Sequence, residues 1–128
     1  MFELTKEFRF EAAHKLPSHD GKCARLHGHS WKGHVILRGP ELHQEGPQAG
    51  MLMDFGRIKA AVKDLVEDKL DHHYLNESTG LENPTSEELA RWVYHQIEDD
   101  LGDLLFAVTI EETCTSSCTY FGRRSKSP

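Results

Sequence analysis

The sequence predicts an α+β fold, a two-layer sandwich in which an antiparallel sheet is covered on one face by two helices. Near both ends of the chain, apolar and polar residues alternate with a period of two, which indicates half-buried strands. Between these segments, apolar residues recur every three to four positions, which indicates amphipathic helices. At 128 residues the chain is long enough for one core, so a single domain is expected over 1–120.

The first two strands are predicted on either side of a turn-rich stretch at 17–21. Over 2–14 most even positions are apolar, and His14 falls in phase with them. A second alternation begins at His27, and its apolar face includes both His27 and His29. All three histidines are therefore expected on the covered face of the sheet.

The first helix is predicted to follow Asp54, whose side chain can cap it. Its apolar positions recur at helical spacing as far as Leu70, which favours packing against the sheet. A short apolar piece at 51–53, just before Asp54, predicts a third strand.

The second helix is predicted to begin with a capping box, in which Thr85 is the N-cap and the Glu88 side chain reaches back to it. Gly102 suits its end. The last alternation places Leu104, Phe106, Val108 and Ile110 on the core face. Glu112 shares that phase, and a buried carboxylate needs a partner, for which a cationic or amino-bearing ligand is suitable.

Composition excludes several classes of partner. A net charge of −6 provides no broad basic face for nucleic acid. No run approaches the roughly 20 apolar residues of a membrane span, and the N-terminal residues do not resemble a signal peptide. Three cysteines without a secretory signal indicate free thiols, so a cytoplasmic protein is expected. Residues 121–128 lack periodicity and are expected to form a disordered tail.

The three in-phase histidines predict a metal site. His27 and His29, at i and i+2 on one strand, project the same way, and His14 from a neighbouring strand can complete a tripod of neutral nitrogens around zinc. Three imidazoles leave the fourth position open, which is typical of a catalytic zinc. Gly28 leaves room for a close backbone approach. One such histidine alone is more often a satisfied core or interface residue.

Two further groups have open interpretations. Cys23 lies four residues before His27 and could be a fourth zinc ligand, a general base or nucleophile, or an ordinary half-buried thiol. Asp71 and His72 follow the first helix. They could form a carboxylate–histidine pair that handles a proton, or a helix cap and solvated turn.

Five sequence blocks, in collinear order between residue 8 and about residue 120, resemble the 6-pyruvoyl-tetrahydropterin synthase family. They are FEAAH at 10–14, CARLHGH at 23–29, LDHHYLN at 70–76, NPTSE at 83–87 and ETC at 112–114. The Cys-x-x-x-His-Gly-His spacing is similar to that of the 6-carboxy-tetrahydropterin synthase branch of queuosine biosynthesis. In the pyruvoyl branch, the cysteine usually lies further from its His-Gly-His.

The resemblance implies a carbon–carbon lyase that converts 7,8-dihydroneopterin triphosphate to 6-carboxy-5,6,7,8-tetrahydropterin, releasing acetaldehyde and triphosphate. Carried over by motif, the zinc ligands are His14, His27 and His29. Cys23 is the proton acceptor, Asp71 with His72 forms a supporting relay, and Glu112 anchors the pterin. Thr85 and Ser86 are candidates for further pterin contacts, although they serve equally as the helix cap.

The resemblance also implies the tunnelling fold, in which the sheets of three subunits close a barrel and two trimers stack into a homohexamer with sites between subunits. The triphosphate requires a local cluster of cations, for which Lys22, Arg25 and Lys32 are candidates. Two alternatives stay open. One is a pyruvoyl-tetrahydropterin synthase, which eliminates triphosphate without splitting off acetaldehyde, and the other is a non-catalytic zinc- or pterin-binding module in which Cys23 closes the metal site.

Overall fold

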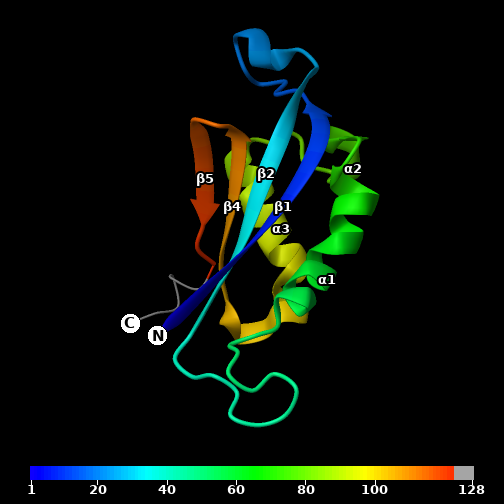
Figure 1. Cartoon of the computed structure of the whole chain (residues 1–128). Helices are drawn as coiled ribbons and strands as arrows, with labels where there is room; N and C mark the ends of the chain where they lie inside the picture. The colour runs from blue at the N-terminus through cyan, green and yellow to red at the C-terminus, as the bar shows by residue number, and fades with distance from the viewer. Residues whose placement is uncertain (123–128) are drawn as a thin grey trace.

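The computed structural model describes residues 1–122, which form a five-stranded sheet with helices packed on one face (Figure 1). The strands, in the spatial order β3-β1-β2-β4-β5, are β1 (Phe2–His14), β2 (His27–Gly39), β3 (His73–Tyr74), β4 (Leu105–Thr113) and β5 (Ser116–Tyr120). The helices are α1 (Phe55–Leu65), α2 (Leu75–Ser78) and α3 (Ser86–Leu101), with short helical turns η1 (Lys22–Ala24), η2 (Val66–Leu70) and η3 (Gly102–Leu104). The α+β prediction is confirmed. The predicted tail at 121–128 lies mostly outside the described residues.

The long β1–β2 hairpin organises the molecule. The two strands pair antiparallel without interruption, from Phe2 opposite Gly39 to His14 opposite His27. Alternation along them turns one face toward α1 and α3, where Phe10 and Trp31 are almost fully buried. The register therefore fixes His14 beside His27 at the end of the hairpin.

The region before α1 differs from its prediction. Residues 51–53 do not form a strand. Leu52 instead packs into the core from a loop that is held by hydrogen bonds within its own backbone, such as the one from the His43 N–H to the Met51 carbonyl. Burial of one loop side chain thus accounts for the apolar signal. Asp54 caps α1 as predicted, its Oδ1 accepting a hydrogen bond from the Gly56 N–H at 2.8 Å.

The N-terminus of α3 has half of the predicted capping box. The Thr85 hydroxyl accepts a hydrogen bond from the Glu88 N–H at 3.1 Å, but the Glu88 carboxylate pairs with Arg91 and does not reach back. Gly102 ends the helix with a φ of +69°, a conformation that favours glycine.

One residue of the last predicted alternation lies on the wrong face. The pairing of β2 with β4 is irregular between Ile36 and Leu37, which shifts the phase so that Leu105 enters the core. Phe106 lies on the opposite face, where the Arg38 guanidinium stands 3.9 Å from its ring centroid. Beyond this irregularity Ile110 is buried, so Glu112 keeps its predicted phase.

The other sheet face is polar, and both edges of the sheet are open as far as residues 1–122 are concerned. Ion pairs such as Glu3 with Arg38 and Glu111 with His34 cover the face away from the helices. Residues 2–10 of β1 pair only with β2, since β3 joins β1, in parallel, at Ala12 and Ala13 alone. Such edges are available for pairing with another chain. No helix within residues 1–122 is long and apolar enough to cross a membrane.

Candidate active site

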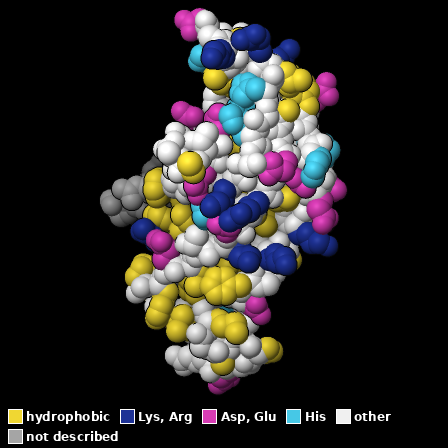
Figure 2. All heavy atoms as spheres, turned by 45° about the horizontal axis from the view of Figure 1, so that its top comes forward, with side chains coloured by type: hydrophobic (Ala, Val, Ile, Leu, Met, Phe, Trp, Pro, Cys, Tyr) yellow, Lys and Arg dark blue, Asp and Glu magenta, His cyan; other side chains and the backbone are white. Residues whose placement is uncertain are grey.

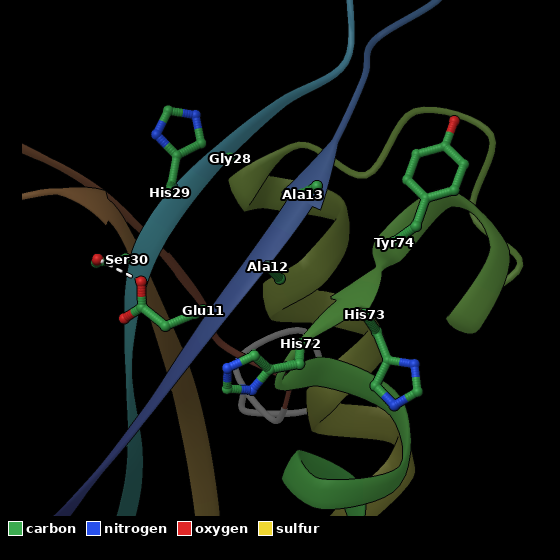
Figure 3. Close-up of a pocket in the computed structure, with 9 residues that line it drawn as sticks. All are labelled: Glu11, Ala12, Ala13, Gly28, His29, Ser30, His72, His73 and Tyr74. Carbon is green, nitrogen blue, oxygen red and sulfur yellow. Dashed lines mark hydrogen bonds between the residues drawn. The ribbon is translucent and has the colours of Figure 1, made fainter.

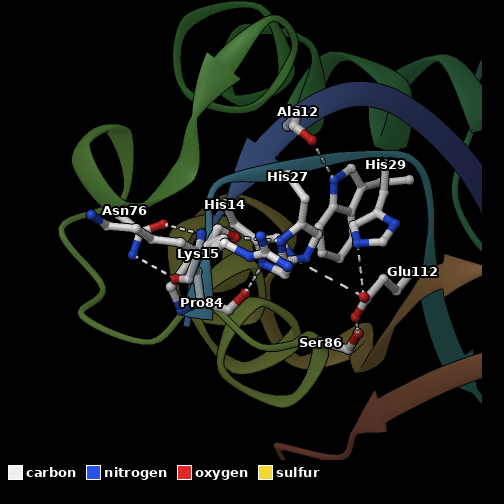
Figure 4. Close-up of polar contacts among 11 residues, drawn as sticks. Ala12, His14, Lys15, His27, His29, Asn76, Pro84, Ser86 and Glu112 are labelled. Atoms are coloured by element: carbon white, nitrogen blue, oxygen red, sulfur yellow. Dashed lines mark hydrogen bonds and ion pairs between the residues drawn. The ribbon is translucent and has the colours of Figure 1, made fainter. Parts of the chain in front are cut away.

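Three histidines and one glutamate converge at the end of the β1–β2 hairpin (Figure 4). His14 comes from β1, His27 and His29 come from β2, and Glu112 comes from β4. One ligand atom from each side chain lies within 4.8 Å of every other. This arrangement could hold a metal ion, as the in-phase histidines predict.

Backbone carbonyls orient two of the imidazoles. His14 Nδ1 donates to the Pro84 carbonyl at 2.8 Å, and His27 Nδ1 donates to the Arg25 carbonyl at 2.7 Å. Because a carbonyl only accepts hydrogen bonds, the proton is assigned to Nδ1, which leaves the Nε2 lone pair free. A ligand histidine held by its other ring nitrogen is typical of protein metal sites.

The nitrogens that face the centre lack hydrogen bonds. Within residues 1–122, His14 Nε2 and His29 Nε2 are the buried side-chain polar atoms without a hydrogen-bond partner. Glu112 Oε1 borders this space, 2.9 Å from His29 Nε2 and 4.0 Å from His14 Nε2. Burial lowers the pKa of His14, which keeps its imidazole neutral. The unmade hydrogen bond of His14 Nε2 costs about 1–3 kcal/mol, and a cation bound there would remove that cost, whereas His29 Nε2 already lies at ion-pair distance from Glu112.

Aromatic packing supports the centre from the core side. Trp31 is 1% exposed, and its ring meets His14 edge-on at 4.9 Å and His29 at 5.4 Å between centroids. Its Nε1 donates to the Ala12 carbonyl at 3.1 Å, and Phe10 stacks on it at 5.7 Å. Trp31 therefore restricts the movement of the His14 and His29 imidazoles toward the core.

Cys23 lies in the same region but outside the four-residue cluster. It lines a cavity of about 400 Å³ together with His27, His29 and Glu112. Within the described chain, the group that joins the histidines at ligand distance is Glu112, so the alternative in which Cys23 closes the metal site finds no support in this geometry.

Asp71 and His72 are held against β1 by hydrogen bonds to the backbone of Glu11. Asp71 Oδ1 accepts a hydrogen bond from the Glu11 N–H at 2.8 Å, while the His72 N–H donates to the Glu11 carbonyl at 2.6 Å. The Glu11 N–H lowers the pKa of the Asp71 carboxyl, and the neighbouring His72 lowers it further. His72 has a φ of +60°, which is rare for a residue with a Cβ and is often found at functional sites.

His72 lines a different cavity from Cys23, and His29 borders both. The His72 cavity is a depression of about 550 Å³ that is also lined by Glu11, Ser30 and Tyr74 (Figure 3). The ring of His29 points away from the ring of His72 in this view. The structure thus does not bring the predicted relay and the predicted base together in one pocket of one chain.

Thr85 and Ser86 connect α3 to the centre. Thr85 is occupied as the helix cap, while the Ser86 hydroxyl donates to Glu112 Oε2 at 3.3 Å. The preceding Pro84 supplies the carbonyl for His14. The roles of the Pro84 and Arg25 carbonyls could not be predicted from the sequence, because every residue has a backbone carbonyl. The position of Glu112 in phase with the core face did predict that its carboxylate needs a partner. It did not predict that Glu112 lies close to the histidines.

Comparisons with known proteins agree on one family. A model described as 6-pyruvoyl tetrahydropterin synthase matches residues 3–123. A protein of Synechocystis named 6-carboxy-5,6,7,8-tetrahydropterin synthase is 49% identical over 97% of this chain and 96% of its own length. A protein of the same name from Haemophilus influenzae is 32% identical over 94% of this chain and 99% of its own length. The solved 6-pyruvoyl tetrahydropterin synthase of Caenorhabditis elegans superposes with a TM-score of 0.81 at 28% identity, covering 94% of this chain and 95% of that chain.

Proposed function

The chain belongs to the 6-pyruvoyl tetrahydropterin synthase family, and from this premise we propose that it is a zinc-dependent 6-carboxy-5,6,7,8-tetrahydropterin synthase. It converts 7,8-dihydroneopterin triphosphate and water to 6-carboxy-5,6,7,8-tetrahydropterin, acetaldehyde and triphosphate, as a cytoplasmic homohexamer in queuosine biosynthesis. The observation that carries the proposal is the short spacing of Cys23 before a three-histidine centre, with thiol and imidazoles lining one cavity.

We assign the metal to His14, His27 and His29. Backbone carbonyls orient the imidazoles of His14 and His27, and the buried Nε2 atom of His14 has no hydrogen-bond partner within residues 1–122. This arrangement suits zinc, which is commonly bound by a small number of imidazole nitrogens. When bound, zinc supplies a Lewis acid that polarises the hydroxyl oxygens of the substrate side chain and acidifies the adjacent C–H and O–H bonds.

Cys23 is proposed as the proton acceptor in this cavity. Its thiol stands on a short turn beside His27 and His29, so it can reach the side chain of a substrate held at the centre. This role needs Cys23 outside the ligand set, which agrees with the composition of the four-residue cluster.

Glu112 is proposed to bind the pterin ring. A carboxylate can accept two parallel hydrogen bonds from the ring N–H and the amino group. Ser86 already donates to Oε2 and fixes that oxygen, while Thr85 stays the helix cap next to it. Glu112 is 28% exposed, which gives a ligand access to its oxygens.

Asp71 and His72 are proposed to act in the cavity of a second copy. The side chain of His72 is 80% exposed, and Asp71 lies 3.0 Å from its Nδ1 while both are held by Glu11. A partner subunit can place such a pair next to Cys23, which the chain alone does not. This supports active sites at subunit interfaces.

The test is incubation of the zinc-loaded protein with 7,8-dihydroneopterin triphosphate, following the pterin and acetaldehyde together by mass spectrometry. Equal amounts of carboxypterin and acetaldehyde are expected, with no turnover after chelation of the metal. A pyruvoyl-tetrahydropterin product without acetaldehyde would assign the chain to the other branch, the activity in the name of the Caenorhabditis elegans protein. No turnover with zinc bound would favour a binding module.

A further inference from the structure

We propose that Lys22 and Arg25 form an anion subsite that binds the triphosphate arm of the substrate. This inference rests on the proposed function and specifies the part of the site that receives most of the substrate's charge. A chain of net charge −6 needs locally free cations to hold a polyphosphate.

The turn η1 brings both cations to one cavity. Lys22 opens this turn, and Arg25 follows it as the C-cap residue, with its N–H donating to the Lys22 carbonyl at 3.1 Å. Lys22 and Arg25 both line the cavity of about 400 Å³ that also contains Cys23, His27 and Glu112.

Both side chains are exposed and have no ion pair among the described residues. Lys32, the third cation suggested by the sequence, differs in its position and in having an ion-pair partner. It lies on the opposite face of the sheet, and its Nζ stands 3.8 Å from the Glu7 carboxylate. Figure 2 shows Lys and Arg side chains gathered at the tip of the molecule, with histidines next to them.

The loop that carries these cations is braced. The Asn76 side chain accepts from the Lys15 N–H at 3.0 Å and donates to the Lys15 carbonyl at 2.8 Å. The Leu16 N–H donates to the Cys23 carbonyl at 2.7 Å, which closes the loop next to η1. The backbone that carries the two cations is therefore held next to Cys23, which lowers the part of the entropic cost of binding that comes from ordering the loop.

The main chain and the side chain of Arg25 have separable roles. Its carbonyl orients His27, and this contact survives replacement of the side chain. Arg25→Ala is thus expected to keep the metal while removing one cation, and Lys22→Ala removes the other. These variants can therefore be compared at equal zinc content.

The test compares the affinity of the protein for two ligands, 7,8-dihydroneopterin triphosphate and the phosphate-free 7,8-dihydroneopterin. Titration calorimetry in a Cys23→Ala background prevents turnover, and kcat/KM is measured with Cys23 present. Each single replacement is expected to weaken triphosphate binding about tenfold, and the double replacement roughly 30- to 100-fold, the size of one and two charge-assisted contacts. Binding of 7,8-dihydroneopterin is expected to change less than about twofold. Lys32→Ala is the matched control and is expected to change neither ligand.

The outcomes separate this inference from the proposed function. If the wild-type protein does not turn over the triphosphate, the proposed function fails, yet calorimetry still tests the subsite. Equal affinity of the wild-type pocket for both ligands would overturn the subsite. So would unchanged triphosphate binding in the double variant, or an equal loss in Lys32→Ala. An affinity for the triphosphate that falls with rising salt, and falls less steeply in the double variant, would support the subsite.

Discussion

Gly33→Ala is expected to destabilise the protein through a clash inside the aromatic packing under the metal centre. A Cβ on Gly33 would lie 2.1 Å from Phe8 Cζ and 2.5 Å from two more atoms of the ring. Ordinary contact begins at 3.4 Å, so the Phe8 ring would have to move by about 1.3 Å. Phe8 is 8% exposed and stacks on Phe10, which stacks on Trp31, so it has little space to move into.

The expected cost is about 2 kcal/mol. Overpacking of a core typically costs about 1–3 kcal/mol, while replacing a strand glycine by alanine returns up to about 1 kcal/mol of chain entropy. A net loss of about 2 kcal/mol corresponds to a fall in Tm of roughly 6–10 °C for a chain of this length. Thermal unfolding of the zinc-loaded protein, at one fixed protein concentration, measures it.

Gly28→Ala on the same strand is the matched control. The nearest atom to its added Cβ is the Ala12 carbonyl oxygen at 3.6 Å, an ordinary contact, so stability is expected to change by less than about 0.5 kcal/mol. The expected close backbone approach at Gly28 is therefore absent. A shorter side chain in Phe8→Leu should partly rescue Gly33→Ala in a double-mutant cycle. Equal stability of the two glycine variants, or no rescue, would refute the clash.

Three further predictions concern the centre itself. Cys23→Ala is expected to keep stoichiometric zinc, measured by metal analysis, and to lose turnover by at least about 100-fold, the size of a general-base contribution; retained turnover would assign the base elsewhere. His29→Ala is expected to lose zinc during dialysis, whereas a surface control, His95→Ala, keeps it; full retention would remove His29 from the ligand set. Glu112→Ala is expected to weaken pterin binding in calorimetry while hardly disturbing the stability of the apo fold, since it removes a partly buried charge; loss of zinc would instead make Glu112 a ligand.

Much of the fold could be predicted from local periodicity. The bounds of β1 and the start of β2 follow from alternation alone, because a hairpin with one face buried tolerates no slip of register. The strand expected at 51–53 was wrong because a short apolar run does not distinguish a strand from a loop that buries Leu52. Phe106 was misplaced because an irregularity in strand pairing leaves no mark on the sequence of β4.

The candidate site divides in the same way. The convergence of His14, His27 and His29 could be predicted, because phase along two adjacent strands fixes the face on which their side chains lie. The hydrogen bond from His14 to the Pro84 carbonyl could not be predicted, since it depends on where the segment before α3 crosses the hairpin. Nor could the separation of His72 from Cys23, which is a property of tertiary structure.

That separation links the site to the edges of the sheet. In one chain Cys23 and the exposed His72 line two different cavities, which share His29. Within residues 1–122, the outer sides of β5 and of residues 2–10 of β1 also have no neighbouring strand, at opposite edges of the sheet. Head-to-tail pairing of these edges would repeat one interface and, where the rotation closes, would give a ring. In such a ring the His72 side chain of each copy can enter the Cys23 cavity of a neighbouring copy. We therefore expect metal binding to be a property of the single chain and turnover to be a property of the assembly.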